Sequence, residues 1–211
     1  MKITRLASIA AFTLITVMPL AAQAPKGWLL RADRSANASD PDAPGVIKFS
    51  AQGSGFHAVT PQAAVFWNPA NVASGNYTLK GTFTLLKPSD HTNYYGLVFG
   101  GSALEGPQQT YLYFLVAQDG TWLIKQRAGD LRTNDIARMR HPAVKTPAAN
   151  GMSTNALEVR VMPEKIDYAI NGTVVHSMPK TGAAAKTDGL YGIRSNHRLE
   201  VRVEDLALSK Q

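Results

Sequence analysis

Short alternating runs of apolar and polar residues, separated by Gly, Pro, Asn and Asp, follow one another after the first 24 residues. In the clearest run, Tyr77, Leu79 and Phe83 alternate with Thr78 and Lys80, as a strand with one buried and one wetted face requires. No helical period of useful length interrupts this pattern. The pattern predicts an all-β chain whose strands span residues 28–32, 46–51, 63–67, 77–86, 95–99, 111–117, 122–127, 156–162, 165–170, 173–177, 190–194 and 198–208.

The last of these strands changes its periodicity part of the way along. Apolar residues from 199 to 203 share one side, whereas Leu206 and Leu208 have the opposite parity. An extra residue in the strand would return both sets to the same core. The sequence therefore predicts a β-bulge near Glu204 and Asp205.

Two dipeptides predict tight hairpins. Asp119-Gly120 and Asn171-Gly172 each lie between two apolar runs. Both are preferred dipeptides for a two-residue type I′ turn. We therefore expect residues 111–127 and 165–177 to form two antiparallel hairpins.

A dozen short strands over about 180 residues are best accommodated by two packed antiparallel sheets, as in a sandwich or jelly roll. The sequence contains no internal repeat and no hydrophobic break large enough to divide the core. Residues 25–211 are therefore expected to form a single jelly-roll domain. Five segments read as loops between strands: 35–45, 88–93, 101–109, 142–155 and 179–188.

The N-terminal segment has the pattern of a secretory signal peptide. Lys2 and Arg5 precede an apolar run over 6–20, and the small-residue motif Ala22-Gln23-Ala24 follows. Cleavage after Ala24 or Ala22 would leave a periplasmic or secreted protein. No membrane insertion is expected after signal removal, because prolines and asparagines break the longest later uncharged stretch, 56–74.

The cysteine content and the net charge limit which kinds of site and which binding partners are expected. The absence of cysteine excludes disulfides, thiolate metal sites and a cysteine nucleophile. Loss of Lys2 and Arg5 would lower the formal charge from +7 to +5, since all 15 acidic residues lie later in the chain. The basic stretch 127–145 reads as a solvated loop, with an anionic glycan or cell-surface polymer as the alternative partner. Nucleic acid is not expected, because dense cations interleaved with aromatics are missing.

Four segments in order resemble a known fold family. They are Asn93–Gly100, the hairpin 111–127, the strand 156–161 and Ile170-Asn171-Gly172. The succession resembles the concanavalin A-like lectin/glucanase jelly roll and, within it, the domain of the 3-keto-disaccharide hydrolase type, which is similar to family 16 glycoside hydrolases. The resemblance implies a carbohydrate ligand, and it leaves enzymatic activity open.

The sequence departs from the glucanases of that family at their catalytic strand. Glycoside hydrolysis needs two carboxylates that flank one bond, and no E-x-D-x-x-E run is present. In the nearest candidate, Arg202 lies between Glu200 and Glu204, which is typical of an ion ladder. The sequence therefore favours carbohydrate binding over catalysis. A hydrolase of 3-keto-disaccharides or related glycosides is the alternative, and a structural or partner-binding envelope protein is a third.

One catalytic pair can be proposed from the second hairpin. A two-residue turn at Asn171-Gly172 places Asp167 opposite His176, where the carboxylate could orient the imidazole as a general base. An inert exposed pair is the alternative interpretation. The other histidines occur singly, without the i, i+2 or i, i+4 spacing of metal ligands. The sequence thus gives no indication of a histidine metal site.

The first hairpin supplies the candidate ligand-binding residues. A two-residue turn at Asp119-Gly120 places Tyr113 opposite Gln126 and puts several polar and aromatic side chains on one face, where sugar rings could stack. That register also puts Lys125 and Arg127 on the apolar face, so burial of the hairpin on both sides is the alternative. The predicted ligand-binding residues are Tyr111, Tyr113, Trp122, Gln126 and Arg194.

A weak cation site lies in the loop Ser39-Asp40-Pro41-Asp42. Asp40 and Asp42 offer carboxylate oxygens, which Ca²⁺ prefers. Calcium is often found in the lectin-like jelly rolls that the chain resembles. An ordinary Pro-rich turn is the alternative, and no other cofactor is expected.

Overall fold

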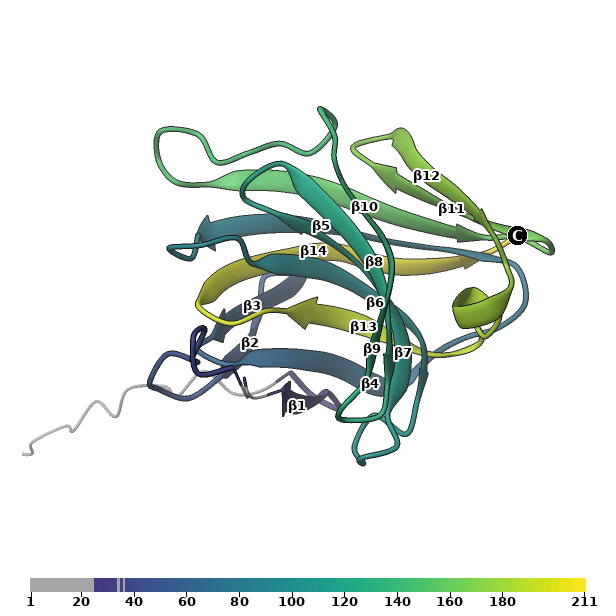
Figure 1. Cartoon of the computed structure of the whole chain (residues 1–211), viewed down its shortest axis with the longest axis horizontal. Coiled ribbons are helices and arrows are strands. Elements are labelled where there is room, and N and C mark those ends of the chain that lie inside the picture. The colour runs from purple at the N-terminus through teal and green to yellow at the C-terminus, as the bar shows by residue number, and fades with distance from the viewer. Residues whose placement is uncertain (1–24, 34, 36) are drawn as a thin grey trace, which may run out of the picture.

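The computed structural model describes residues 25–33, 35 and 37–211 (Figure 1), so the predicted signal peptide lies outside the described residues. Every regular element of the described residues except one short 3₁₀ helix is a strand, which confirms the all-β prediction. The elements are β1 (Leu29–Asp33), β2 (Lys48–Gln52), β3 (Gly55–Thr60), β4 (Ala63–Ala73), β5 (Tyr77–Lys87), β6 (Tyr94–Ser102), β7 (Thr110–Ala117), β8 (Thr121–Ala128), β9 (Thr133–Arg140), β10 (Ser153–Val161), β11 (Lys165–Ile170), β12 (Thr173–Pro179), the 3₁₀ helix η1 (Gly182–Ala184), β13 (Gly189–Ser195) and β14 (Leu199–Lys210).

Two antiparallel sheets of seven strands form the predicted sandwich (Figure 1). Sheet A has the order β1-β4-β13-β6-β7-β8-β9, and sheet B has the order β12-β11-β10-β5-β14-β3-β2. Strands that are adjacent in space often lie far apart in the sequence, so the chain passes repeatedly from one sheet to the other. This jelly-roll topology gathers loops from distant parts of the sequence at each end of the sandwich.

The main core lies between the two sheets. Alternate residues of the strands point into it, including Leu79 and Phe83 from sheet B and Phe66 and Phe114 from sheet A, all at most 1% exposed. Burial at roughly 25 cal/mol per Å² of apolar surface makes this layer the main stabilising contribution to the fold. The alternation predicted for residues 77–86 is therefore confirmed.

A second apolar cluster covers the outward face of sheet A. It includes Trp67, Val98, Tyr111 and Leu115, each at most 2% exposed, and it is separate from the main core. Strand β7 contributes to both clusters, so every residue from Tyr111 to Ala117 is buried. The alternative of burial on both sides is therefore the correct one for this strand.

The β7–β8 turn differs from the predicted two-residue turn. Three residues, from Gln118 to Gly120, connect the strands, and Gly120 takes a φ of 85°. A type I′ turn would require positive φ at Asp119 as well, but Asp119 keeps a negative φ. Its carboxylate instead accepts hydrogen bonds from the backbone N–H and the hydroxyl of Thr121, at 3.0 and 2.6 Å.

This extra loop residue shifts the register of the hairpin by one position. Tyr113 pairs with Lys125 and not with Gln126. A one-residue slip moves a strand's side chains to the opposite face. Trp122 and Gln126 therefore lie on the face opposite to Tyr111 and Tyr113, and the predicted grouping of these four side chains is wrong.

The second hairpin follows the prediction at its turn and departs from it further along. Asn171 and Gly172 have φ values of 50° and 83°, as a type I′ turn requires. A bulge after Tyr168 then shifts the pairing, so that Asp167 lies opposite Ser177 and not His176.

The irregularity predicted in the last strand is present. The register of β14 against β5 shifts between Glu204 and Ala207, and Asp205 takes a φ of 53°. Leu206 and Leu208 consequently pack against the main core. The predicted bulge is thus confirmed, together with its consequence for burial.

Two of the strands were not predicted from the sequence. Strand β9 (Thr133–Arg140) runs through the basic stretch that reads as a solvated loop, and β3 (Gly55–Thr60) lies between the predicted strands 46–51 and 63–67, in a segment to which no element was assigned. Strand β9 forms one edge of sheet A and none of its residues is fully buried, so its apolar signal is weak.

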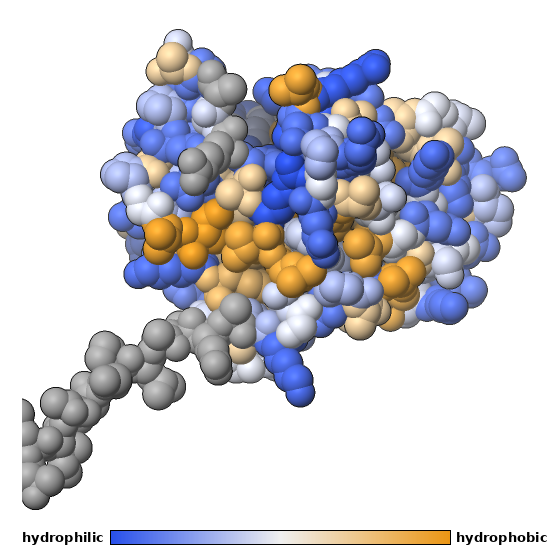
Figure 2. Space-filling model, turned by 90° about the horizontal axis from the view of Figure 1, so that it is seen from below, coloured by the Kyte–Doolittle hydropathy of each residue, from blue (hydrophilic) through white to orange (hydrophobic). Residues whose placement is uncertain are grey.

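The opposite edge of sheet A carries exposed apolar side chains. Leu30 of β1 and Val72 of β4 are 43% and 57% exposed, and Figure 2 shows a band of apolar surface on the side of the molecule where these strands lie. Within the described ranges, no helix has the length and apolar character needed to cross a bilayer.

Candidate functional site

A groove opens on the outward face of sheet A, next to the end of the sandwich where three loops cross between the sheets. Its volume is about 260 Å³. We call it the sheet A groove. The floor is formed by Tyr94, Tyr113, Leu115 and Leu123, and the rim by Asp40, Thr92, Asn93, Lys125, Arg138 and Asn196.

Two tyrosines in the floor carry cations over their rings. The guanidinium carbon of Arg138 lies 5.4 Å from the ring centroid of Tyr94, and that of Arg194 lies 5.4 Å from the centroid of Tyr113. Burial raises the pKa of the Tyr113 hydroxyl, so this phenol stays protonated at neutral pH. The floor therefore combines two largely buried phenol rings, each with a guanidinium over it, with their hydroxyl groups.

The rim supplies amide, hydroxyl and cationic groups. Lys125 extends from β8 and is paired with Asp135 at 2.7 Å. Arg138 from β9 is exposed and has no ion pair among the described residues. The backbone N–H of Asn196 donates to the carbonyl of Tyr94 at 2.8 Å, which fixes the loop after β13 against the groove. The rim can thus donate hydrogen bonds to a polar ligand.

A buried ion pair lies beside the floor on the same face of sheet A. Arg194 donates to the carboxylate of Asp33 and, at 2.7 Å, to the hydroxyl of Tyr111. The side chains of Asp33 and Arg194 are only 7% and 10% exposed. Although burial acts in the opposite direction, the charge of Arg194 and its hydrogen bond lower the pKa of Asp33. Both groups are therefore charged at neutral pH.

The five predicted ligand-binding residues do not all reach the groove. Tyr113 lies in its floor, and Tyr111 and Arg194 are buried next to Tyr113 on the same face of the sheet, with 1% and 9% exposure. Trp122 is fully buried in the main core. Gln126 donates to the carbonyl of Ala183 at 2.9 Å on the other face of the sheet. The register shift at the β7–β8 turn accounts for both corrections.

The predicted catalytic pair is separated by the bulge in β11–β12. Asp167 accepts a hydrogen bond of 2.5 Å from Ser177 and one of 3.1 Å from Lys165. His176 instead lies beside Trp122, with ring centroids 5.5 Å apart. The two side chains therefore cannot act together as a general base, and the alternative of a hydrolase loses the residues proposed for it.

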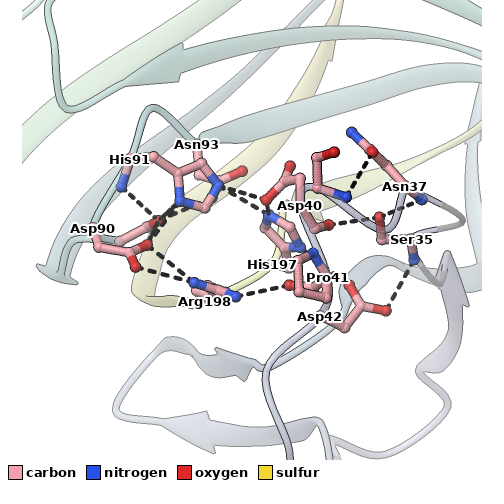
Figure 3. Close-up of polar contacts among 12 residues, drawn as sticks. Ser35, Asn37, Asp40, Pro41, Asp42, Asp90, His91, Asn93, His197 and Arg198 are labelled. Carbon is pink, nitrogen blue, oxygen red and sulfur yellow. Dashed lines mark hydrogen bonds and ion pairs between the residues drawn. The ribbon is translucent and has the colours of Figure 1, made fainter.

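Asp40 and Asp42 lie where three sheet-crossing loops converge, as Figure 3 shows. Asp40 and Asp42 belong to the β1–β2 loop, His91 to the β5–β6 loop and His197 to the β13–β14 loop. Asp40 Oδ1 lies 3.0 Å from His91 Nε2 and 3.2 Å from His197 Nε2. We call Asp40, His91 and His197 the loop triad; Asp40 is also part of the groove rim.

The sequence indicated Asp40 as a weak cation ligand but not His91 and His197, because the three residues are far apart along the chain. His91 and His197 are separated by 106 residues, and no local spacing marks them. Their meeting depends on the order in which β5–β6 and β13–β14 cross between the sheets. A prediction of strand order could have indicated it, but a motif search could not.

Comparisons with solved structures show the fold. The chain is similar to the carbohydrate binding module CBM66 from Bacillus subtilis, with 9% identity, a TM-score of 0.62, and coverage of 87% of this chain and 96% of that one. It is also similar to a protein of unknown function with a galectin-like fold from Bacillus subtilis, with 14% identity, a TM-score of 0.59, and coverage of 88% and 90%.

A third similar structure is the carbohydrate recognition domain of Emp47p, with 9% identity, a TM-score of 0.54, and coverage of 88% and 89%. No family model matches the chain, and no curated protein matches it. At such low identity these likenesses establish the jelly-roll fold and not an activity. The narrower resemblance to the 3-keto-disaccharide hydrolase type remains an expectation.

Proposed function

We propose that this chain binds a carbohydrate in the sheet A groove. The observation that carries the proposal is the composition of the groove, in which a floor of phenol rings and leucines is surrounded by amide, hydroxyl and cationic groups. Sugars present apolar C–H faces and many hydroxyls, so they fit such a mixed surface. Two of the similar structures are named as a carbohydrate binding module and a carbohydrate recognition domain, which supports the same ligand class.

The size and charge of the groove narrow the ligand. About 260 Å³ is below the roughly 300–1,000 Å³ typical of drug-sized sites, so the groove suits one sugar residue or the end of a chain. Arg138, which has no ion pair among the described residues, supplies a cation at the rim, whereas Lys125 is paired with Asp135. A glycan from the cell surface that carries a carboxylate is therefore expected to bind better than its neutral counterpart.

Isothermal titration with neutral sugars and uronic acids tests this proposal. Thr92→Trp fills the groove from an exposed rim position and should abolish binding without affecting the core. Arg138→Ala should weaken uronate binding about tenfold or more, which corresponds to roughly 1.4 kcal/mol. Arg132→Ala is the matched control, because Arg132 lies in the β8–β9 turn outside the groove.

Two results would contradict the proposal. One is the absence of sugar binding by the unmodified protein at millimolar concentrations. The other is unchanged affinity in Thr92→Trp, which would place the sugar elsewhere on the molecule.

The cellular location is part of the proposal. We infer that residues 1–24 are removed as a signal peptide and that residues 25–211 act as one jelly-roll domain in the periplasm or outside the cell. The basic and small-residue pattern of the N-terminal sequence supports this inference. Glycans of the cell surface are accessible from these compartments.

A further inference from the structure

We propose that the loop triad of Asp40, His91 and His197 binds a divalent transition-metal ion. This proposal does not depend on the proposed sugar binding. It starts from the positions of three ligand atoms. His91 Nε2 and His197 Nε2 are 3.2 Å apart, and Asp40 Oδ1 lies 3.0 and 3.2 Å from them. The three atoms form a nearly equilateral triangle.

The dimensions of this triangle match one face of a metal coordination shell. With metal–ligand bonds of about 2.0–2.1 Å, neighbouring ligands are about 3.3 Å apart in a tetrahedron and about 2.9 Å apart in an octahedron. The observed separations of 3.0–3.2 Å lie between these values. The imidazole planes are inclined by 84°, so the rings meet at their nitrogen edges and do not stack.

The second nitrogen of each imidazole faces a further carboxylate. His91 Nδ1 lies 2.7 Å from Asp90 Oδ1, and His197 Nδ1 lies 3.1 Å from Asp42 Oδ1. An ionised carboxylate can only accept, so each Nδ1 donates its proton there. This fixes the tautomer and leaves a lone pair on each Nε2. Carboxylates in this position are the usual orienting partners of metal-binding histidines.

Three lone pairs therefore converge, and they repel one another unless a cation lies between them. A proton on one imidazole would satisfy a single contact, whereas a metal ion satisfies all three. The amide of Asn93 donates through Nδ2 to His91 Nε2 at 3.0 Å and to Ser89 Oγ, so it already partners one of the three lone pairs. A half-turn of this amide would present its oxygen instead as a fourth ligand atom.

The surrounding charges favour a cation and hold the loops together. Three carboxylates, those of Asp40, Asp42 and Asp90, contact the two imidazoles, whereas the one guanidinium among these groups, that of Arg198, pairs with Asp90. Arg198 donates to Asp90 at 3.0 Å and to the carbonyl of Pro41 at 2.9 Å, which ties two of the loops to the third (Figure 3). The positions of the three loops are therefore fixed by contacts that do not involve the three ligand atoms.

The ligand types select the class of ion. Two imidazole nitrogens and one carboxylate oxygen suit Zn²⁺, Fe²⁺ or Co²⁺, whereas Ca²⁺ prefers oxygen ligands alone. His197 is 7% exposed, but His91 and Asp40 are 37% and 42% exposed. A metal held here would therefore keep an open coordination position towards solvent, next to the rim of the sheet A groove.

Metal titration tests the proposal directly. Protein treated with EDTA and dialysed is titrated calorimetrically with Zn²⁺, and separately with Co²⁺ while its visible spectrum is recorded. One Zn²⁺ per chain should bind with micromolar or tighter affinity, and Co²⁺ should give visible bands of nitrogen and oxygen coordination. His91→Ala and Asp40→Asn, both at partly exposed loop positions, should each weaken Zn²⁺ binding at least 100-fold.

Two further variants test whether Zn²⁺ binds at the loop triad and not at another histidine. Asp42→Asn should weaken binding about 10- to 100-fold, because it releases the orientation of His197. His57→Ala is the matched control, since His57 lies on β3 and pairs with Glu200 at 2.9 Å. Circular dichroism verifies that each variant is folded. The metal proposal would be overturned if the protein took up no stoichiometric Zn²⁺, or if His91→Ala and His57→Ala bound Zn²⁺ with equal affinity. Neither result would contradict the proposed sugar binding.

Discussion

Asp33→Asn is expected to lower the free energy of unfolding at pH 7 by about 3–5 kcal/mol, because breaking a buried ion pair leaves its partner charge uncompensated. The Asp33 carboxylate accepts hydrogen bonds from Arg194 and, at 3.2 Å, from Tyr111, and Arg127 lies 3.5 Å away. The amide keeps the shape of the side chain but removes its charge. Urea denaturation followed by tryptophan fluorescence measures the effect.

Asp135→Asn is the matched control for this substitution. Asp135 forms a pair with Lys125 at 2.7 Å, but its side chain is 75% exposed, so the change should cost about 0–1 kcal/mol. Equal losses in the two variants would show that the Asp33 pair does not stabilise the fold.

The contribution of Asp33 should also depend on pH. The folded pKa lies below the unfolded value of about 3.9, so the stabilisation is fully present above that pH and is lost as the pH falls through the folded pKa. The difference between the unmodified protein and Asp33→Asn should therefore narrow below about pH 4. A difference that stays constant down to pH 2 would contradict the assignment.

Gly96→Ala is expected to destabilise the protein by about 3 kcal/mol or more, from the combined costs of backbone strain and overpacking. Gly96 lies in β6 with a φ of 155°, a conformation that L side chains rarely adopt. An added Cβ would lie 2.4 Å from the carbonyl oxygen of Phe114 and 2.7 Å from a methyl group of Leu157. Neither neighbour can retreat, because both belong to the packed interior.

Gly75→Ala separates the cost of backbone strain from the cost of overpacking. Gly75 has a φ of 71°, but an added Cβ would meet nothing within 4 Å. This variant should therefore lose about 1–2 kcal/mol from the left-handed backbone alone. Thermal unfolding monitored by circular dichroism compares the two, and a loss in Gly96→Ala no larger than in Gly75→Ala would be inconsistent with the packing argument.

Periodicity was sufficient to predict the class of fold, since the alternation in β5, β10 and β14 follows directly from a face that must be buried. The β14 bulge was predictable for the same reason, because Leu206 and Leu208 could reach the core in no other way. The edge strand β9 was not predictable, because it has little apolar signal. For β9, weak burial is therefore the reason why the sequence carried no strand signal.

The β7–β8 hairpin shows why candidate site residues are harder to predict than strands. Asp119-Gly120 resembles a two-residue turn, yet the carboxylate of Asp119 bonds to Thr121 and adds one residue to the loop. That single residue sends Trp122 into the main core and brings Lys125 to the groove. In the sequence, the mismatch of Lys125 and Arg127 with the apolar face was the signal that the register is shifted by one residue.

The loop triad lies beyond the reach of local patterns for a different reason. Its ligands come from three connections whose proximity is determined by the strand order of both sheets. The spacing of residues in a sequence indicates which side chains are neighbours on one strand or helix. It does not indicate which loops from distant parts of the chain lie close together in the fold.

The double burial of β7, between the two apolar clusters, has a consequence for the motions of the protein. Neighbouring β6 is also buried over almost its whole length, whereas β9 and β12 lie at sheet edges. Backbone amides of β6 and β7 should therefore exchange with deuterium only when the entire molecule unfolds, while those of β9 and β12 exchange through small local openings. Mass spectrometry after deuterium labelling would reveal this gradient, and the slowest amides would lie directly beneath the sheet A groove, which would make its floor the most rigid part of the chain.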